Sequence, residues 1–112
     1  LVSKSSDKYI TYNILLELYR VITSKVYQHK LPFSEATNLM NYIRHDFKIL
    51  HSTAVTESIL NDLIQEYKPK SGGVWDYLIL AQAIENGVAI IYTKNTKDFP
   101  ENGLVKIVDP TV

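Results

Sequence analysis

Apolar side chains recur along the chain at two spacings, which together predict helices separated by short strands. Helical spacing covers residues of about 13–24, 34–46, 53–67 and 74–86. Short apolar or β-rich runs lie at 8–11, 47–50, 89–92 and 104–108. Strands that alternate with helices predict a parallel sheet with helices on both faces, because parallel neighbours need crossover connections. The chain is therefore expected to have an α/β fold.

Residues that begin and end helices refine these boundaries. Ser34 is predicted to be the N-cap of the second helix, and Ser52 or Thr53 the N-cap of the third. Gly87 follows the fourth helix, where a left-handed C-terminal cap is expected. The run 89–92 is apolar throughout, which predicts a strand buried on both faces.

Composition is typical of an ordinary globular protein. The 112 residues are 46% hydrophobic and 21% charged, which predicts a single domain over residues 1–112. No apolar run approaches the roughly 20 residues that span a bilayer, so no membrane association is expected and a cytoplasmic location is the default. Cysteine is absent, which excludes disulfides, cysteine nucleophiles and thiolate zinc sites.

Charge limits how the chain could bind nucleic acid. The formal net charge is zero, so the broad basic surface of a protein that holds nucleic acid mainly through its phosphates is missing. His29, His45 and His51 show no paired metal-ligand spacing, and any metal is therefore expected to have oxygen ligands. Local lysines and a bound cation would have to supply the attraction for nucleic acid.

Two acids lie within apolar helical segments. Glu17 lies in the segment 14–19, about two turns after the first strand, and Asp76 lies in the first turn of the fourth helix. Each has a simpler structural interpretation, since Glu17 can pair with Arg20 and Asp76 can complement the helix dipole. Ligands of open parallel sheets bind outside the carboxyl ends of the strands. Two such acids near that edge favour a functional site.

The segment 93–99 begins where the predicted strand 89–92 ends. It places Asn95 and Asp98 three residues apart on one turn. Asn and Asp are common in turns for local reasons, but here the turn lies at the expected ligand edge. With Glu17 and Asp76 they predict an oxygen-rich site for a hard cation such as Mg²⁺. Such a site can polarise a phosphodiester and activate water without a covalent intermediate.

These residues carry a resemblance to a known family. Residues 75–83, 86–88 and 90–99 resemble the C-terminal half of PIN domains, especially VapC-like toxins, and 15–22 resembles the second acidic motif of that family. The resemblance spans nearly the whole chain in element order, with 30–70 matching only in pattern. It implies a Rossmann-like parallel sheet flanked by helices, a Mg²⁺ or Mn²⁺ site and endoribonuclease activity on RNA. It also implies a homodimer and, in toxin members, an antitoxin partner.

Carried over by position, the resemblance assigns roles to seven side chains. The metal ligands would be Glu17, Asp76, Asn95 and Asp98, of which the three acids are catalytic. The substrate contacts would be Thr93, Lys94 and Lys97, with Thr93 orienting the loop or touching the substrate.

The chain departs from the PIN pattern at two places. The family normally opens with a strand that carries an Asp-Thr-Asn motif, whose aspartate is a principal metal ligand; no such strand is present, and Asp7 is misplaced to replace it. Asn95 also lies where many members have an acid. Because the first residue is Leu1 rather than Met, we expect that an upstream segment was removed or is missing. We therefore expect the 112-residue chain to be a weak or inactive nuclease that an upstream strand would activate.

Two other interpretations compete with the nuclease. One is a PIN-like module that has lost catalysis and keeps only protein or RNA contacts, which the absent first strand favours. The other is a phosphoryl-accepting receiver domain. That domain would need paired acids directly after its first strand and a lysine after a later one, and neither arrangement is clear. No Gly-rich phosphate loop is present either.

Aromatic residues are more numerous in the first half of the chain than one small core needs. They are Tyr19, Tyr27, Phe33 and Tyr42. Since aromatic side chains are favoured at interfaces, they predict a homodimer built on the early helices.

Overall fold

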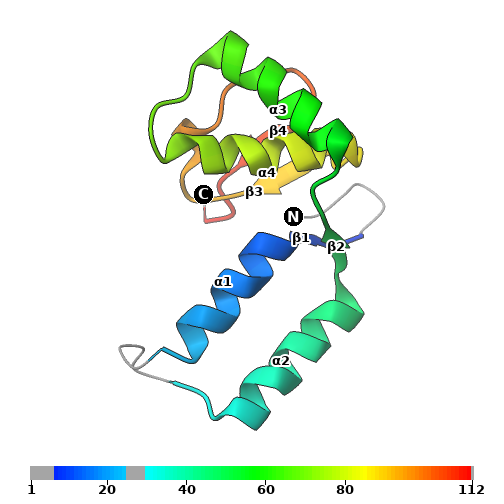
Figure 1. Cartoon of the computed structure of the whole chain (residues 1–112), viewed down its shortest axis with the longest axis vertical. Coiled ribbons are helices and arrows are strands. Elements are labelled where there is room, and N and C mark those ends of the chain that lie inside the picture. The colour runs from blue at the N-terminus through cyan, green and yellow to red at the C-terminus, as the bar shows by residue number, and fades with distance from the viewer. Residues whose placement is uncertain (1–6, 25–29, 112) are drawn as a thin grey trace.

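A computed structural model describes residues 7–24 and 30–111 of the chain (Figure 1). The elements, in order, are β1 (Tyr9–Thr11), α1 (Tyr12–Ile22), α2 (Phe33–Asp46), β2 (Lys48–Leu50), α3 (Ala54–Tyr67), α4 (Gly73–Glu85), β3 (Ile90–Tyr92), the 3-10 turn η1 (Thr96–Asp98) and β4 (Lys106–Val108). Each strand and helix expected from the sequence is present, and the α/β class is confirmed.

The strands form two separate parallel pairs instead of one continuous sheet. In the described part of the chain, β1 pairs with β2 and β3 pairs with β4. Thr11 lies opposite Leu50 in the first pair, and Ile91 lies opposite Ile107 in the second. The sequence predicted one continuous sheet. In the described residues that sheet is interrupted between β1 and β3, because no strand there hydrogen-bonds to both of them.

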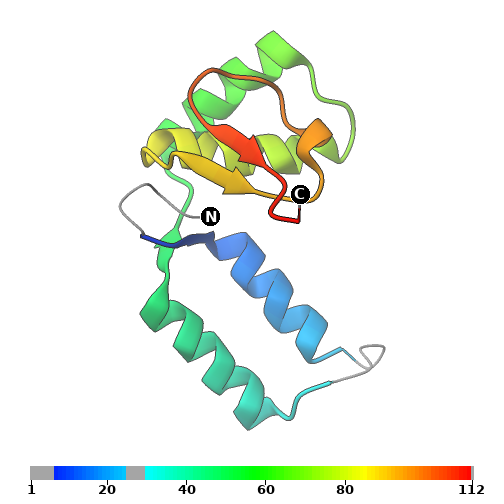
Figure 2. The same ribbon diagram turned by 180° about the vertical axis from the view of Figure 1, so that it is seen from behind.

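The helices also differ from the expected arrangement around the sheet. Figures 1 and 2 show α3 and α4 on the same face of the β3–β4 sheet. The expectation that β3 is buried on both faces is therefore wrong: Ile91 is 3% exposed, whereas Tyr92 is 39% exposed. The Ile91 side chain is covered by the core, whereas the Tyr92 side chain at the end of the strand is exposed to solvent.

The core lies between α3, α4 and the β3–β4 sheet. Its buried members come mainly from these elements: Leu50, Leu63, Tyr77, Leu80, Ala81, Ala83, Val88, Ile91, Phe99 and Val105. Burying a large apolar side chain contributes about 1.5–3 kcal/mol. The helix α4 is central to this core because it packs on α3 with one side and on β3 with another.

The helix starts show one correct and one incorrect cap prediction. Thr53 caps α3, since its hydroxyl accepts from the amides of Val55 and Thr56 at 3.1 and 3.3 Å. Ser34 does not cap α2, because that helix already begins at Phe33, directly after Pro32 with its φ of −58°. The Gly87 prediction is confirmed by a positive φ of 66°.

Glu85, the last residue of α4, ties that helix to the start of α3. Its carboxylate accepts hydrogen bonds from the hydroxyl groups of Thr53, at 2.6 Å, and Thr56. These two bonds lower the pKa of Glu85 below its ordinary value. The carboxylate form is therefore the one that stabilises the folded state.

Replacing Glu85 with glutamine is expected to lower the melting temperature at pH 7. Because the pKa of Glu85 is lower in the folded state, its contribution is present above the unfolded pKa of 4.5 and is lost as the pH falls through the folded value. The difference in Tm between wild type and Glu85→Gln should therefore shrink between pH 7 and pH 3, as measured by circular dichroism. Glu66→Gln, at an exposed position of α3, is the matched control. A difference that stays constant with pH would contradict this role.

The helices α1 and α2 lie side by side and extend away from the α3–α4 core (Figures 1 and 2). Phe33 and Tyr42, both on α2, are 71% and 59% exposed. Tyr19 is half-buried, and Tyr27 lies outside the described residues. None of the helices in the described ranges is long and apolar enough to cross a membrane.

Candidate functional site

Asp76 lies in the first turn of α4, in a half-buried position. Its pKa is raised above the ordinary value, mainly because burial disfavours the charged form and further because of the nearby Asp98 carboxylate. The helix α4 and the strand β3 run in opposite directions, so the start of α4 lies at the carboxyl end of β3 (Figure 2). This arrangement brings together two of the acids that the sequence analysis selected.

The turn after β3 holds the other oxygen groups. The Thr93 hydroxyl accepts a hydrogen bond from the amide of Asn95 at 3.1 Å. Asn95 is the N-cap of η1, and its carbonyl accepts from the amide of Asp98 at 3.0 Å. Short hydroxyl and carbonyl bonds of this kind fix a turn locally. Thr93 thus holds the turn, and Asn95 and Asp98 are exposed on it.

A pocket of about 270 Å³ lies beside Asp76, between the two parallel strand pairs. Its walls come from β1, α1, α4 and β3, from the residue before β2, and from the segment after β3: Tyr9, Ile10, Ile14, Phe47, Asp76, Ile79, Ile91, Tyr92, Thr93 and Phe99. Most of these side chains are apolar, and Asp76 and Thr93 are among the few polar groups. The pair of acids therefore lies at the margin of a mostly apolar space.

Glu17 is not part of the Asp76 and Asp98 pair. It is exposed on α1, and its carboxylate accepts hydrogen bonds from two nitrogens of Arg20, one of them at 3.1 Å. The bond to Arg20 lowers the pKa of Glu17. This is the simpler interpretation that the sequence left open. Within residues 7–24 and 30–111, no three or more His, Asp or Glu side chains form a group that could hold a metal ion.

Glu17 nevertheless approaches the same helix as Asp76. It lines a second pocket of about 370 Å³, together with Trp75 of α4. That pocket and the one beside Asp76 share the side chains of Ile14 and Ile79. The two pockets are therefore neighbours, and the Glu17 carboxylate is paired with Arg20 on α1.

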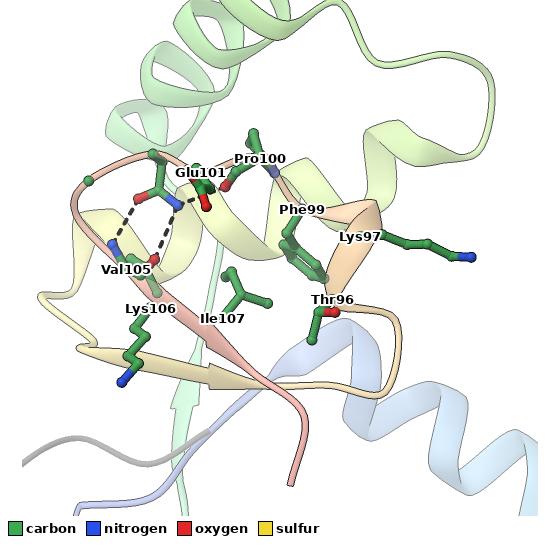
Figure 3. Close-up of a pocket in the computed structure, with 10 residues that line it drawn as sticks. Thr96, Lys97, Phe99, Pro100, Glu101, Val105, Lys106 and Ile107 are labelled. Atoms are coloured by element: carbon green, nitrogen blue, oxygen red, sulfur yellow. Dashed lines mark hydrogen bonds between the residues drawn. The ribbon is translucent and has the colours of Figure 1, made fainter. Parts of the chain in front are cut away.

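The two candidate lysines are exposed. Lys94 lies in the turn after β3, and Lys97 lies in η1 at the rim of a groove of about 670 Å³ between the 96–103 segment and β4. Figure 3 shows the Lys97 side chain pointing away from this groove. Asn102 also lines the groove, and its side-chain amide donates to the carbonyls of Pro100 and Val105 at 3.2 Å each. The lysines are thus free to reach a ligand outside the groove.

Two features of the site region were not predicted from the sequence. Tyr9 and Ile10 of β1 line the pocket beside Asp76. Tyr12 and His51 form a ring pair at the carboxyl ends of β1 and β2. The available signal was position, since both ring residues directly follow a predicted strand.

The oxygen groups after β3 fit a hard divalent cation. Two carboxylates that repel each other, with an amide oxygen on the same turn, are the donor types that Mg²⁺ and Mn²⁺ prefer. A cation held by Asp76 and Asp98 would offset both the burial and the repulsion by Asp98 that raise the pKa of Asp76. Three acids were expected at this site. Asp76 and Asp98 interact with each other, whereas Glu17 is paired with Arg20.

Comparison with known proteins adds no relative: no family model matches the chain, and no curated protein sequence is significantly similar to it. Function is therefore inferred from the site and from the sequence motifs.

Proposed function

We propose that the chain is the greater part of a PIN-like, metal-dependent endoribonuclease domain of the VapC toxin type, with a Rossmann-like arrangement of its parallel strands. The observation that carries this proposal is the interacting pair of Asp76 and Asp98 at the carboxyl end of β3, beside a pocket. A carboxyl group with a raised pKa in such a position, as Asp76 has, is typical of active sites. The motifs around both residues, which resemble those of PIN domains, support the same function.

Each side chain has a stated role in this proposal. Asp76, Asp98 and Asn95 would hold Mg²⁺ or Mn²⁺, and the bound ion would supply a polarised phosphodiester and an activated water. Thr93 keeps the turn in place through the amide of Asn95. Lys94 and Lys97 would attract the RNA backbone, because phosphate contacts supply most of the sequence-independent affinity.

Glu17 would take part only after its carboxylate is released from Arg20. The pair is exposed, and exposed ion pairs contribute little to stability, so a divalent cation could compete for the carboxylate. In that case Glu17 would reach the site from the neighbouring pocket along Ile14 and Ile79.

A second candidate function is a catalytically impaired PIN-like module that binds RNA or protein. The ion pair between Glu17 and Arg20 favours it, as does the division of the strands into two pairs. The exposed Phe33 and Tyr42 on α2 would serve either function as a homodimer surface, or as the surface for an antitoxin protein.

The two functions differ in metal binding and in hydrolysis. We expect Mn²⁺ to bind the chain, as measured by loss of the free-ion EPR signal, and to support slow cleavage of a fluorogenic single-stranded RNA. Cleavage should stop in EDTA and return when Mn²⁺ is added in excess, which distinguishes it from metal-independent contaminants. RNA binding with neither Mn²⁺ binding nor cleavage would overturn the nuclease in favour of the impaired module.

A further inference from the structure

The carboxyl edge of the β1–β2 pair carries two adjacent rings. Thr11 and Leu50 are opposite each other in the parallel register, so the residues that follow them, Tyr12 and His51, emerge side by side. Their ring centroids are 5.2 Å apart, with the planes inclined by 34°. Tyr12 is half-buried and His51 is exposed, so the pair presents ring surface to solvent.

Arg44 adds a positive charge to this ring pair. Its guanidinium carbon lies 5.8 Å from the centroid of the Tyr12 ring. Arg44 is exposed, and in the described part of the chain it makes no ion pair, whereas Arg20 and Lys48 each pair with a carboxylate. Its charge is therefore available to an anionic ligand.

Rings beside an unpaired guanidinium have the chemistry that binds single-stranded nucleic acid. Bases stack on aromatic and histidine rings without regard to sequence, and an arginine can both stack and contact a phosphate. The formal net charge of the chain is zero, so contacts other than overall charge, such as base stacking, would have to contribute to affinity.

The ring pair is also well placed for an RNA that reaches the pair of acids. In Figures 1 and 2, β1 and β3 run in the same direction, so the carboxyl ends of these two strands point toward the same side of the molecule. The turn that carries Asp98 and the rings of Tyr12 and His51 each follow such an end.

We propose that Tyr12, His51 and Arg44 form a substrate subsite, in which one unpaired base of a single-stranded RNA stacks on the His51 and Tyr12 rings while Arg44 contacts the neighbouring phosphate. The choice of RNA as the ligand rests on the proposed nuclease function. The geometry of the rings and the guanidinium is independent of any metal ion.

The test measures binding without cleavage. A fluorescein-labelled 12-nucleotide oligoadenylate RNA is titrated with the chain in EDTA, and Kd is read from fluorescence anisotropy. His51→Ala and Arg44→Gln should each weaken binding by about 10-fold, the scale of one stacked base or one charged contact. His45→Ala is the matched control, since His45 is an exposed histidine on α2, and its Kd should stay within about twofold of wild type. Both His variants are at exposed positions and are expected to fold.

Two further readouts separate stacking from a general loss of charge. An oligonucleotide of the same length with abasic sites keeps its phosphates, and wild type should bind it about as weakly as His51→Ala binds the intact RNA. In NMR spectra, the ring protons of His51 should shift when the RNA is added, and those of His45 should not. Equal affinity of His51→Ala and His45→Ala, equal affinity for the abasic strand, or no binding of RNA by wild type would each overturn the subsite.

Failure of the subsite and failure of the nuclease give different results. If wild type binds RNA through His51 but never cleaves it with Mn²⁺, the subsite stands and the proposed nuclease is wrong. If His51→Ala cleaves with the wild-type KM, the subsite is wrong and the nuclease stands.

Discussion

Replacing Asp76 with asparagine is expected to reduce Mn²⁺-dependent RNA cleavage by about 100-fold or more, since even residues that only support metal ligands cost 10–100-fold when changed. The substitution keeps the shape of the side chain in the first turn of α4 and removes its charge. Initial rates on a fluorogenic RNA would measure the loss, and EPR titration would show weaker Mn²⁺ binding.

The same substitution is expected to leave the fold intact or slightly more stable. The pKa of Asp76 is raised in the folded state, so its stabilising contribution is present below the unfolded pKa of 3.8 and is lost as the pH rises through the folded value. At pH 7 the half-buried carboxylate near Asp98 opposes folding. Asp76→Asn should therefore raise Tm at pH 7 by a few degrees, which corresponds to about 0.5 kcal/mol.

An exposed acid of α3 offers the matched control for Asp76. Asp62→Asn should change neither the rate nor the Tm by a measurable amount. In wild type, Mn²⁺ affinity should fall as the pH is lowered through the raised pKa of Asp76, because the ion binds the carboxylate form. Cleavage by Asp76→Asn at the wild-type rate would show that this residue is not part of a metal site.

An additional strand placed between β1 and β3 is expected to produce the second large effect. Within the described residues β1 pairs only with β2, and β3 only with β4. β1 and β3 therefore each have one edge without a hydrogen-bonded strand, beside the pocket lined by Ile10 and Ile91. A strand there would gain hydrogen bonds on two sides and cover apolar surface. We expect a gain of roughly 2–4 kcal/mol, or about 10 °C or more in Tm.

The strand and its chemistry can be tested separately by lengthening the chain ahead of Leu1. One version carries a strand-forming segment that ends in Asp-Thr-Asn, and the matched version ends in Asn-Thr-Asn. Both should melt at higher temperature than the 112-residue chain, but only the aspartate version should bind Mn²⁺ more tightly and cleave RNA faster. If the 112-residue chain already cleaves as fast as the aspartate version, or if neither version is more stable, the proposed place for the strand is wrong.

Local features of the fold could be predicted from the sequence because they depend on near neighbours. Thr53 caps α3 and Gly87 ends α4 through bonds and backbone angles within one turn. The prediction that Ser34 is the N-cap of α2 was wrong, although it also concerns near neighbours, because the helix already begins directly after Pro32. Helix and strand order therefore followed from periodicity, with errors of a residue or two at the ends.

The division into two strand pairs could not be predicted, because strand pairing depends on residues far apart in the chain. Glu17 shows the same limit, since helical spacing placed it on α1 but could not decide between Arg20 and a distant acid. Asp76 and Asp98 were predictable because opposite directions of α4 and β3 necessarily bring their ends together. The ring pair of Tyr12 and His51 needed the register of β1 against β2, which no short-range signal provides.

The division of the strands also has a consequence for the order in which the chain folds. β3 and β4 are joined by a short segment, and α3 and α4 by a shorter one, so their contacts close small loops. β1 and β2 are separated by both α1 and α2, and their pairing must close a much longer loop. Nearly all members of the core belong to the later half of the chain. Residues from β2 onward can therefore form a cooperative unit of their own, and β1 with α1 adds to it as a later and less stable unit.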